Sequence, residues 1–466
     1  MRKSVGVVLS AGAALAWASP AFAGDAGAEA EIAELKVEIA AQDKQLSEQA
    51  ALLKAQAARL EAIENQLQSS AAPASPPPTA GVPAGAIATS PDSPSPAQVA
   101  ANDEAAPASD TTIGGYGEIT YNGYLKDKSR NQADLKRFVL FFGHRFDDKL
   151  SFNSEFEVEH AIASADDAGE AEIEQAYLNY RFGQGVNLKA GLFLMPFGFL
   201  NRNHEPPVFY GVERNEVETR IIPSTWREGG VGIYGSTAFG LDYDFGVTTG
   251  FDVAKLDDAG APLAGSHQEL QLAKAANLSF YGSLEYRGVP GLLLGTAVFT
   301  GDATHDNADF KADATLPDFA GITSRVTLWD VHGRWQHNGL DLEALYARGT
   351  IGRARALDSV LLGYNAANGA DLPVVPSAFY GWLVQAAYSI PVGGEMTLDP
   401  FVRYEKFDTQ ARLPLGLVAD LANRDRVLTT GFSFRPLDQV VVKVDYQKFF
   451  ENSDNDRVNV GLGYMF

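Results

Sequence analysis

Apolar and polar residues alternate with a period of two from residue 113 to the end of the chain at residue 466. Sixteen runs rich in Val, Tyr, Phe, Leu and Thr recur there, each bounded by turn residues, and this pattern predicts β-strands. The runs begin near residues 114, 135, 149, 172, 186, 226, 241, 278, 292, 324, 340, 380, 396, 424, 439 and 457. The pattern therefore predicts an all-β domain of sixteen antiparallel strands.

The connections between these runs alternate in length. Short turns such as Gly183-Gln184-Gly185 and His337-Asn338-Gly339 are followed by long loops. The longer loops expected on this rim include residues 195–225, which form the third of them, 253–277, 301–323, 350–378 and 408–423. Short turns on one rim and long loops on the other are typical of outer-membrane β-barrels. The last run, from Arg457 to the terminal Phe466, alternates in the same way. Residues 113–466 are thus expected to form a 16-stranded transmembrane β-barrel.

Charged residues fall on one face of the predicted strands. Phe138, Leu140 and Phe142 share a face, whereas Arg137 and Phe141 lie on the other. An Arg or Lys facing lipid at the bilayer centre costs about 2–4 kcal/mol, so the charged face is expected to line a hydrated lumen. The expected lumen residues are the cations Arg137, Arg145, Lys189, Arg334, Arg403 and Lys443 and the carboxylates Glu155, Glu157, Asp330, Glu343 and Glu405. Cations on one side of the lumen that face carboxylates on the other suggest an electric field across the channel.

The third long loop, residues 195–225, is the candidate constriction, because a sixteen-stranded barrel is wide enough for an aqueous channel unless something narrows it. Its arginines, Arg202, Arg214 and Arg220, are candidates for solute contact, since guanidinium groups bind carboxylates and phosphates with two parallel hydrogen bonds. Glu213 and Glu218 belong to the same candidate site. In an alternative interpretation, the arginines pair with the loop carboxylates Glu205, Glu213, Glu216 and Glu218 and only hold its shape.

Three segments of different character precede the barrel. Residues 1–23 read as a signal peptide, with Arg2 and Lys3 before an apolar run and Ala21-Phe22-Ala23 before the cleavage position. Residues 24–68 are expected to form a periplasmic coiled-coil helix, because aliphatic residues recur every seventh position at Ile32, Ile39, Leu46, Leu53, Leu60 and Leu67. The alternatives are an inner-membrane anchor for the first segment and a single surface helix for the second. Residues 69–112 read as an extended linker rich in Pro, Ala and Ser.

Composition limits the chemistry that the chain can perform. It contains no cysteine, which excludes disulfides and thiolate metal sites. The seven histidines are scattered without metal-binding spacing, and no Gly-rich phosphate loop precedes a helix. No enzyme, cofactor, metal or nucleic-acid partner is therefore expected. The net charge is -22, of which -15 falls after residue 112, although a local basic strip can still steer anions. Acidic loops such as 302–309 and 452–456 indicate solvated loops, or loops that contact divalent cations bridging lipopolysaccharide.

Three motifs in and beside the third long loop resemble the phosphate-selective porin O/P superfamily: Pro196-Phe197-Gly198, His204-Glu205-Pro206-Pro207 and the run from Glu218 to Glu228. The signal peptide, heptads and Pro-rich linker resemble its DcaP-type branch. This resemblance implies a homotrimer of sixteen-stranded channels in the outer membrane, narrowed by the third loop and taking up small, often anionic solutes.

The arginine ladder and lysine cluster of phosphate-specific members are not evident in this chain. Small carboxylates or dicarboxylates are therefore the expected solutes, with phosphate or polyphosphate as the alternative. A second alternative is a structural anchor in outer-membrane lipid and lipopolysaccharide, tethered to peptidoglycan by the coiled coil.

Overall fold

The computed structural model describes residues 36, 54, 110–164, 167–183, 185–305 and 317–466. The predicted signal peptide and residues 69–109 of the predicted linker lie outside the described residues. Of the predicted coiled coil only Lys36 and Lys54 are described, and both are helical and exposed. The chain divides into two units, Met1–Ala86 and Ile87–Phe466, and the following description concerns the second.

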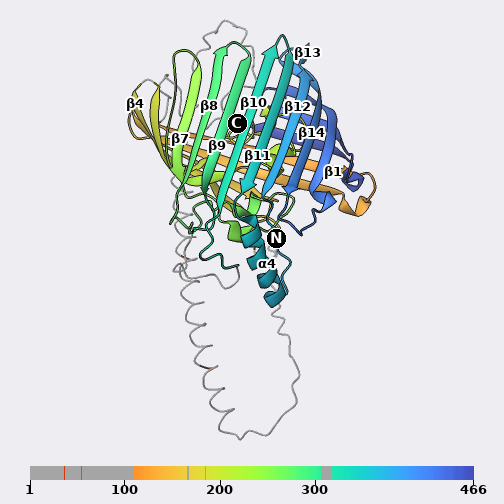
Figure 1. Cartoon of the computed structure of the whole chain (residues 1–466). Coiled ribbons are helices and arrows are strands. Elements are labelled where there is room, and N and C mark those ends of the chain that lie inside the picture. Colours follow the sequence, from red (N-terminus) through yellow and green to blue (C-terminus); the bar gives the residue numbers. More distant parts are fainter. Residues whose placement is uncertain (1–35, 37–53, 55–109, 165–166, 184, 306–316) are drawn as a thin grey trace. The chain divides into compact units, whose positions relative to one another are not determined.

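The second unit is a closed antiparallel β-barrel (Figure 1). Its strands are β1 (Thr111–Tyr124), β2 (Gln132–Arg145), β3 (Leu150–Glu159), β4 (Ala171–Gly183), β5 (Val186–Leu194), β6 (Arg227–Ser236), β7 (Leu241–Thr248), β8 (Ser279–Val289), β9 (Leu292–Asp302), β10 (Arg325–His337), β11 (Leu340–Ile351), β12 (Ala378–Tyr388), β13 (Ile390–Gly393), β14 (Met396–Arg412), β15 (Arg424–Leu437), β16 (Val440–Phe449) and β17 (Arg457–Met465). Each strand pairs with the next one along the chain, with both β12 and β13 pairing with β14, and pairing of β1 with β17 closes the sheet.

The wall contains sixteen strands within the described residues, because β12 and β13 pair successively with β14 and form one strand interrupted at Ser389. The predicted sixteen-stranded barrel is thus confirmed. Each predicted start lies within three residues of the start of its strand. Some strands extend beyond the predicted bounds. β1 already begins at Thr111, inside the predicted linker, and β9, β11 and β14 continue to Asp302, Ile351 and Arg412, inside the predicted loops 301–323, 350–378 and 408–423.

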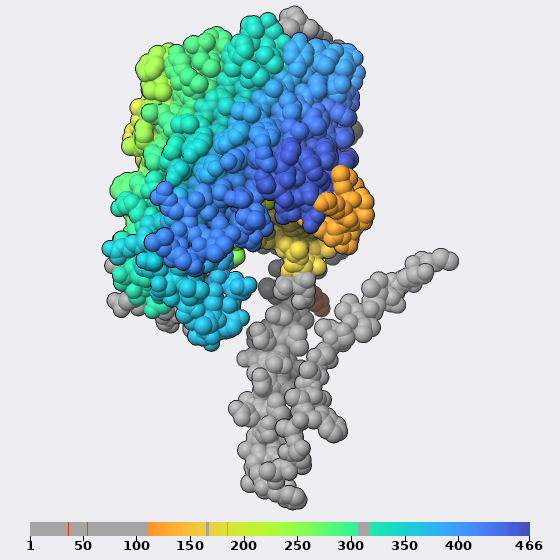
Figure 2. Space-filling model, turned by 45° about the vertical axis from the view of Figure 1, so that its right-hand side comes forward, coloured from red at the N-terminus to blue at the C-terminus, as the bar shows by residue number. Residues whose placement is uncertain are grey.

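The predicted division of the strands into two faces is also observed. On β2 the outward Leu140 and Phe142 are 37% and 44% exposed, whereas Arg137, Val139 and Phe141 on the other face are buried. The final strand repeats this pattern, with Val458, Val460 and Leu462 exposed and the residues between them buried. The outer wall is continuous across the strands in the space-filling view (Figure 2). The exposed apolar face is the surface that a lipid bilayer covers.

The two rims differ as the sequence predicted. At the rim that carries α4 in Figure 1, the long loops L3 (195–226), L4 (249–278), L5 (303–324) and L6 (352–377) connect the strands. The helices are η1 (Lys128–Arg130), η2 (Pro206–Val208), α3 (Val217–Arg220), η3 (Val253–Lys255), η4 (Ala264–Ser266), α4 (Ala354–Asn368), η5 (Leu421–Asn423) and η6 (Ser453–Asn455). Among the described residues, none of the helices has the length and apolarity needed to cross a membrane.

Helix α4 was not predicted, since residues 350–378 were expected to form a plain loop. It buries Leu357 and Leu361, which lie four residues apart and therefore share one helix face. Gly369 ends the helix in the left-handed conformation, with φ of 64°, and its N–H donates to the Asn365 carbonyl.

Candidate functional site

L3 begins and ends in an apolar cluster at the loop rim. Met195, Phe197, Ile221 and Trp226 are at most 1% exposed there. The Trp226 ring packs against Phe197, Phe251 of L4 and Phe299 of β9, with centroid separations of 4.9, 4.8 and 5.1 Å. This packing joins both ends of L3 to L4 and the wall.

Asn201 closes the base of L3 with three hydrogen bonds. Its side-chain amide donates to the carbonyls of Met195 and Trp226, both at 2.8 Å, and its oxygen accepts from the Trp226 N–H at 2.7 Å. Asn201 is buried, so these bonds satisfy backbone groups that water does not reach. The first and last residues of L3 are therefore held together like the base of a hairpin.

The middle of L3 crosses the lumen to the opposite wall. The Asp445 carboxylate of β16 accepts from the Val212 N–H at 2.6 Å, and the Glu405 carboxylate of β14 accepts from the Glu216 N–H at 2.7 Å. L3 starts from β5 and returns to β6, which lie far around the barrel from β14 and β16. The loop therefore spans the barrel and does not stay beside its own strands.

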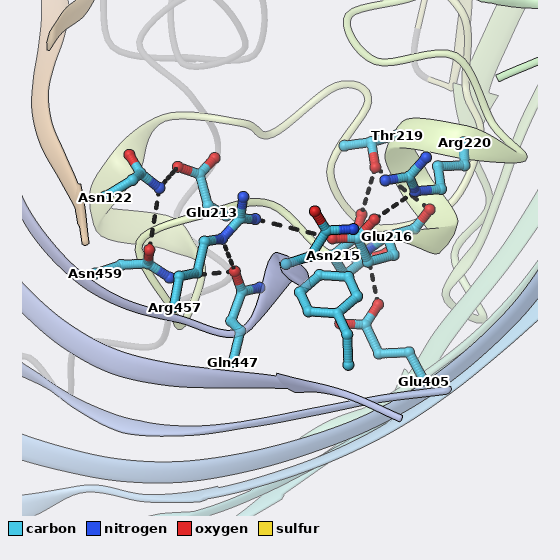
Figure 3. A network of polar contacts seen from close by, with 12 residues as sticks. Asn122, Glu213, Asn215, Glu216, Thr219, Arg220, Glu405, Gln447, Arg457 and Asn459 are labelled. Atoms are coloured by element: carbon cyan, nitrogen blue, oxygen red, sulfur yellow. Dashed lines mark hydrogen bonds and ion pairs between the residues drawn. The ribbon is translucent and has the colours of Figure 1, made fainter. Parts of the chain in front are cut away.

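A polar network fixes the far side of L3 (Figure 3). Lys136 of β2 forms an ion pair of 2.5 Å with Glu213, and Asn122 of β1 donates to Glu213 at 2.9 Å. Burial alone would raise the pKa of Glu213, but the neighbouring cations Lys136 and Arg457 outweigh it and lower this pKa to about 2. Glu213 is therefore ionised at any physiological pH and holds L3 to the first two strands.

The three predicted loop arginines have different surroundings. Arg202 forms an ion pair of 2.9 Å with Glu285 of β8, and Arg220 one of 2.5 Å with Glu216 in its own loop. Arg214 is buried and donates to the hydroxyls of Ser224 and Thr225 at 2.6 and 2.8 Å. Its Nε and Nη2 atoms have no hydrogen-bond partner, and no carboxylate pairs with it among the described residues. The alternative, that loop carboxylates hold these arginines, fits Arg220 alone.

Glu218 organises the loop from within. It is 3% exposed and accepts hydrogen bonds from the N–H groups of Phe199 and Leu200 at 2.6 and 2.8 Å and from the Asn215 amide at 2.5 Å. A carboxylate that accepts three short hydrogen bonds is held firmly in place by the protein. Glu218 thus holds the two halves of L3 together.

Most of the predicted wall residues form ion pairs along the barrel wall. These pairs are Arg137–Glu157 at 3.6 Å, Arg334–Glu343 at 3.2 Å, Arg403–Glu405 at 2.7 Å, Lys189–Asp244 at 2.6 Å and Arg145–Asp110 at 2.9 Å. The prediction that the two signs face each other across the lumen is wrong for the first three pairs. Antiparallel register sets Arg334 directly beside Glu343, for example, so neighbouring strands neutralise each other's charges.

Two predicted wall carboxylates have other surroundings. Asp330 accepts from His332 at 2.6 Å, and the N–H of Gly198 in L3 lies 3.4 Å from it. Glu155 is buried beside Glu174 and His204. Asp330 and His332 share the inward face of β10, as their spacing of two residues indicates. The grouping of Glu155 with Glu174 and His204 was not predicted, because these residues lie on two strands and in L3.

Unlike the other predicted wall cations, Lys443 of β16 has no ion-pair partner among the described residues. It is 2% exposed, and its Nζ has no hydrogen-bond partner but lies 3.4 Å from the ring centroid of Phe209 in L3. A neighbouring cation, Arg435 of β15, was missed by the sequence analysis. It pairs with Asp399 and donates to the Pro207 carbonyl of L3 at 3.1 Å. The period of two could have identified Arg435, because it lies two residues after the buried Ser433 and therefore on the same inward face of β15.

Comparison with known proteins agrees with this architecture. The family model described as phosphate-selective porin O and P matches residues 114–222. An uncharacterised protein of Aquifex aeolicus (strain VF5) is 32% identical over 361 residues, which cover 76% of this chain and 80% of that protein.

Solved structures with a similar fold include OmpF of Salmonella typhi in complex with daunomycin, at a TM-score of 0.52 and 15% identity over 76% of this chain and 97% of that one. The outer-membrane channel DcaP of Acinetobacter baumannii gives a TM-score of 0.45 and 13% identity, with the same coverages of 76% and 97%. With a closed sixteen-stranded wall and a family match that includes most of L3, this chain belongs to the phosphate-selective porin O and P family, which consists of outer-membrane channels and not of enzymes.

Proposed function

We propose that this channel admits small hydrophilic anions, carboxylates and dicarboxylates above all, and that L3 is its constriction. The observation that carries the proposal is the pair of buried cations at L3, Arg214 and Lys443, which have no carboxylate partner among the described residues. Charge inside a barrel is screened less than charge on a surface, so an unpaired cation creates a local potential that attracts anions.

Two further arginines of L3 are suited to direct solute contact. The side chains of Arg202 and Arg220 are each 30% exposed, unlike the buried Arg214. A guanidinium group carries five N–H donors, and each of these arginines gives only part of them to the protein. The remaining donors offer a carboxylate the paired hydrogen bonds that it binds best.

The paired wall charges bear on the choice between carboxylates and phosphate. Arg137, Arg334 and Arg403 are each neutralised by a neighbouring carboxylate. A phosphate dianion needs several uncompensated cations close together, whereas the described part of the barrel offers Arg214 and Lys443. Phosphate remains the second candidate solute, because the family model carries that description.

Reversal potentials in a salt gradient across a planar bilayer test the proposal. Wild-type channels are expected to prefer anions, and replacing Arg202, Arg214 and Arg220 together with Ala is expected to lower that preference. Lys443→Ala should lower it as well. Arg426→Ala is the matched control, because this arginine is paired with Glu451 and exposed. An unchanged reversal potential in the triple variant would remove L3 from the selectivity argument.

Liposome swelling with phosphate, monocarboxylates, dicarboxylates, sugars and amino acids then ranks the solutes. Faster swelling with dicarboxylates than with phosphate supports the proposal, and the reverse order supports the phosphate-selective alternative. A barrel that conducts no current would favour the other alternative, a structural anchor tethered by the coiled coil.

We propose in addition that the protein is a homotrimer whose N-terminal segment lies in the periplasm. The heptad of residues 32–67 supports this assembly, because an aliphatic stripe on an isolated helix would be exposed to water. Single-channel recordings are expected to show three equal conductance steps for each inserted protein, and the mass in detergent is expected to be that of a trimer. Single steps and a monomeric mass would contradict it.

A further inference from the structure

A cluster of buried acidic groups lies where L3 meets β3 and β4. Glu155 of β3, Glu174 of β4 and His204 of L3 each direct one ligand atom into the cluster, and these atoms lie within 4.8 Å of one another. All three residues are at most 3% exposed. None of these three residues is among the proposed solute contacts.

The histidine of this cluster presents a lone pair to it. His204 Nδ1 lies 3.2 Å from the Asn201 carbonyl, which only an N–H on that atom satisfies. In the neutral ring the other nitrogen, Nε2, is then unprotonated, as it is in metal-binding histidines held by a backbone carbonyl. Nε2 has no hydrogen-bond partner and lies 3.8 Å from a Glu174 oxygen. The cluster therefore brings together acceptors without a donor.

Glu174 has the fewest hydrogen bonds of the three residues. It is 0% exposed, and neither of its carboxylate oxygens has a hydrogen-bond partner. Glu155 also has one unpartnered oxygen, and Glu157 is buried beside it on the same face of β3. A buried ionised carboxylate without a hydrogen bond is strongly unfavourable, so a proton or a metal ion shared between the oxygens would stabilise this arrangement.

A break in the regular strand pairing directs Glu174 inward. Glu155 pairs with Gln175, but the next residue, Phe156, pairs with Ile173, which leaves Glu174 as an extra residue in β4. Both Glu174 and Gln175 are buried as a result, although consecutive strand residues normally face opposite sides. β-Bulges of this kind re-aim side chains next to functional sites.

We propose that Glu155, Glu174 and His204 bind one divalent transition-metal ion of the zinc class, which fixes L3 to β3 and β4. One imidazole nitrogen with carboxylate oxygens is a ligand set that zinc accepts at about 2.0–2.2 Å, whereas calcium and magnesium prefer oxygen alone. Ligands at those lengths lie roughly 3–4 Å apart, so atoms already within 4.8 Å need only a small contraction.

The test measures zinc bound to the full-length protein in detergent. The protein is stripped with a chelator, dialysed against Zn²⁺, and its metal content is determined by mass spectrometry. One zinc ion per chain is expected. His204→Gln and Glu174→Gln should each weaken zinc binding at least about tenfold, because each removes a ligand. His332→Gln is the control, since this buried histidine also contacts L3, through Phe199 at 5.0 Å, but lies outside the cluster.

X-ray absorption of the zinc-loaded wild type keeps the test decisive where a variant does not fold. A first shell of one imidazole nitrogen with oxygen neighbours is expected, and a shell of several imidazoles would overturn the proposal. Equal zinc binding in His204→Gln and wild type would also overturn it. A wild type that takes up no zinc would overturn it as well. If Glu174→Gln were then at least as stable as the wild type, shared protons would suffice to hold the carboxylates together.

Discussion

The packing of L3 against the wall is tested most directly at Gly463. This residue lies on the inward face of β17, and a Cβ built there would lie 2.2 Å from the Cβ of Pro206 in L3. Pro206 belongs to η2, and its ring cannot turn aside as a flexible side chain would. We therefore predict that Gly463→Ala displaces the middle of L3 from this side of the barrel.

The size of the effect follows from the distance. Ordinary contacts of a Cβ begin at 3.4 Å, so L3 or β17 has to move by about 1.2 Å. Overpacking of this kind costs about 1–3 kcal/mol in a well-packed core. The neighbouring bond from the Val212 N–H to Asp445 should lengthen with the same movement. We expect a lower free energy of unfolding and a changed single-channel conductance.

Gly461→Ala is the matched control on the same strand face. Its added Cβ would lie 3.1 Å from Val212 Cγ1, a shortfall of a few tenths of an ångström that a small side-chain shift removes. Urea unfolding followed by tryptophan fluorescence and conductance in planar bilayers measure both variants. If Gly463→Ala matches Gly461→Ala in stability and conductance, L3 is not packed against β17 as described.

The remaining predictions concern L3 and one surface ion pair. Trp226→Ala removes the ring that joins L3 to Phe251 and Phe299 and should lower the free energy of unfolding by about 3–5 kcal/mol in the same urea assay. Glu218→Ala leaves two buried N–H groups unpaired, so a loss of about 1–3 kcal/mol and noisier single-channel currents are expected. Arg426→Ala breaks an exposed pair and should change neither stability nor conductance measurably.

The strands were predictable from the sequence because lipid outside and water inside impose the same two-residue period on every one of them. Strand starts at residues 186, 241 and 340 were placed without error. The prediction of L3 as the loop that enters the barrel relied on its length and position. Helix α4 was missed, since its pair Leu357 and Leu361 is too short a signal within a long loop.

The surroundings of the charged side chains were harder to predict. A period of two shows which face a residue occupies, but only the register shows which residue stands beside it. Arg334 was correctly assigned to the inward face, yet its partner Glu343 was expected across the lumen and lies on the adjacent strand. The bulge shifts the alternation in β4, because Ile173 faces outward before it and Leu178 and Tyr180 face outward after it. That shift does not show which residue Glu174 meets, so its contact with His204 was not visible in the sequence.

Different residues of L3 anchor the loop to the barrel and set the charge in the lumen. Its ends are held by apolar packing around Trp226 and by the hydrogen bonds of Asn201, so substitutions there are expected to lower the free energy of unfolding. Its middle is held by wall carboxylates that bind backbone N–H groups, as Asp445 does at Val212. These bonds use the backbone of Val212 and Glu216, whereas Glu213 holds L3 to β1 and β2 with its own carboxylate. Substitutions such as Arg214→Ala can therefore change the field in the lumen without releasing the loop, whereas changes at the base of L3 affect folding and conduction together.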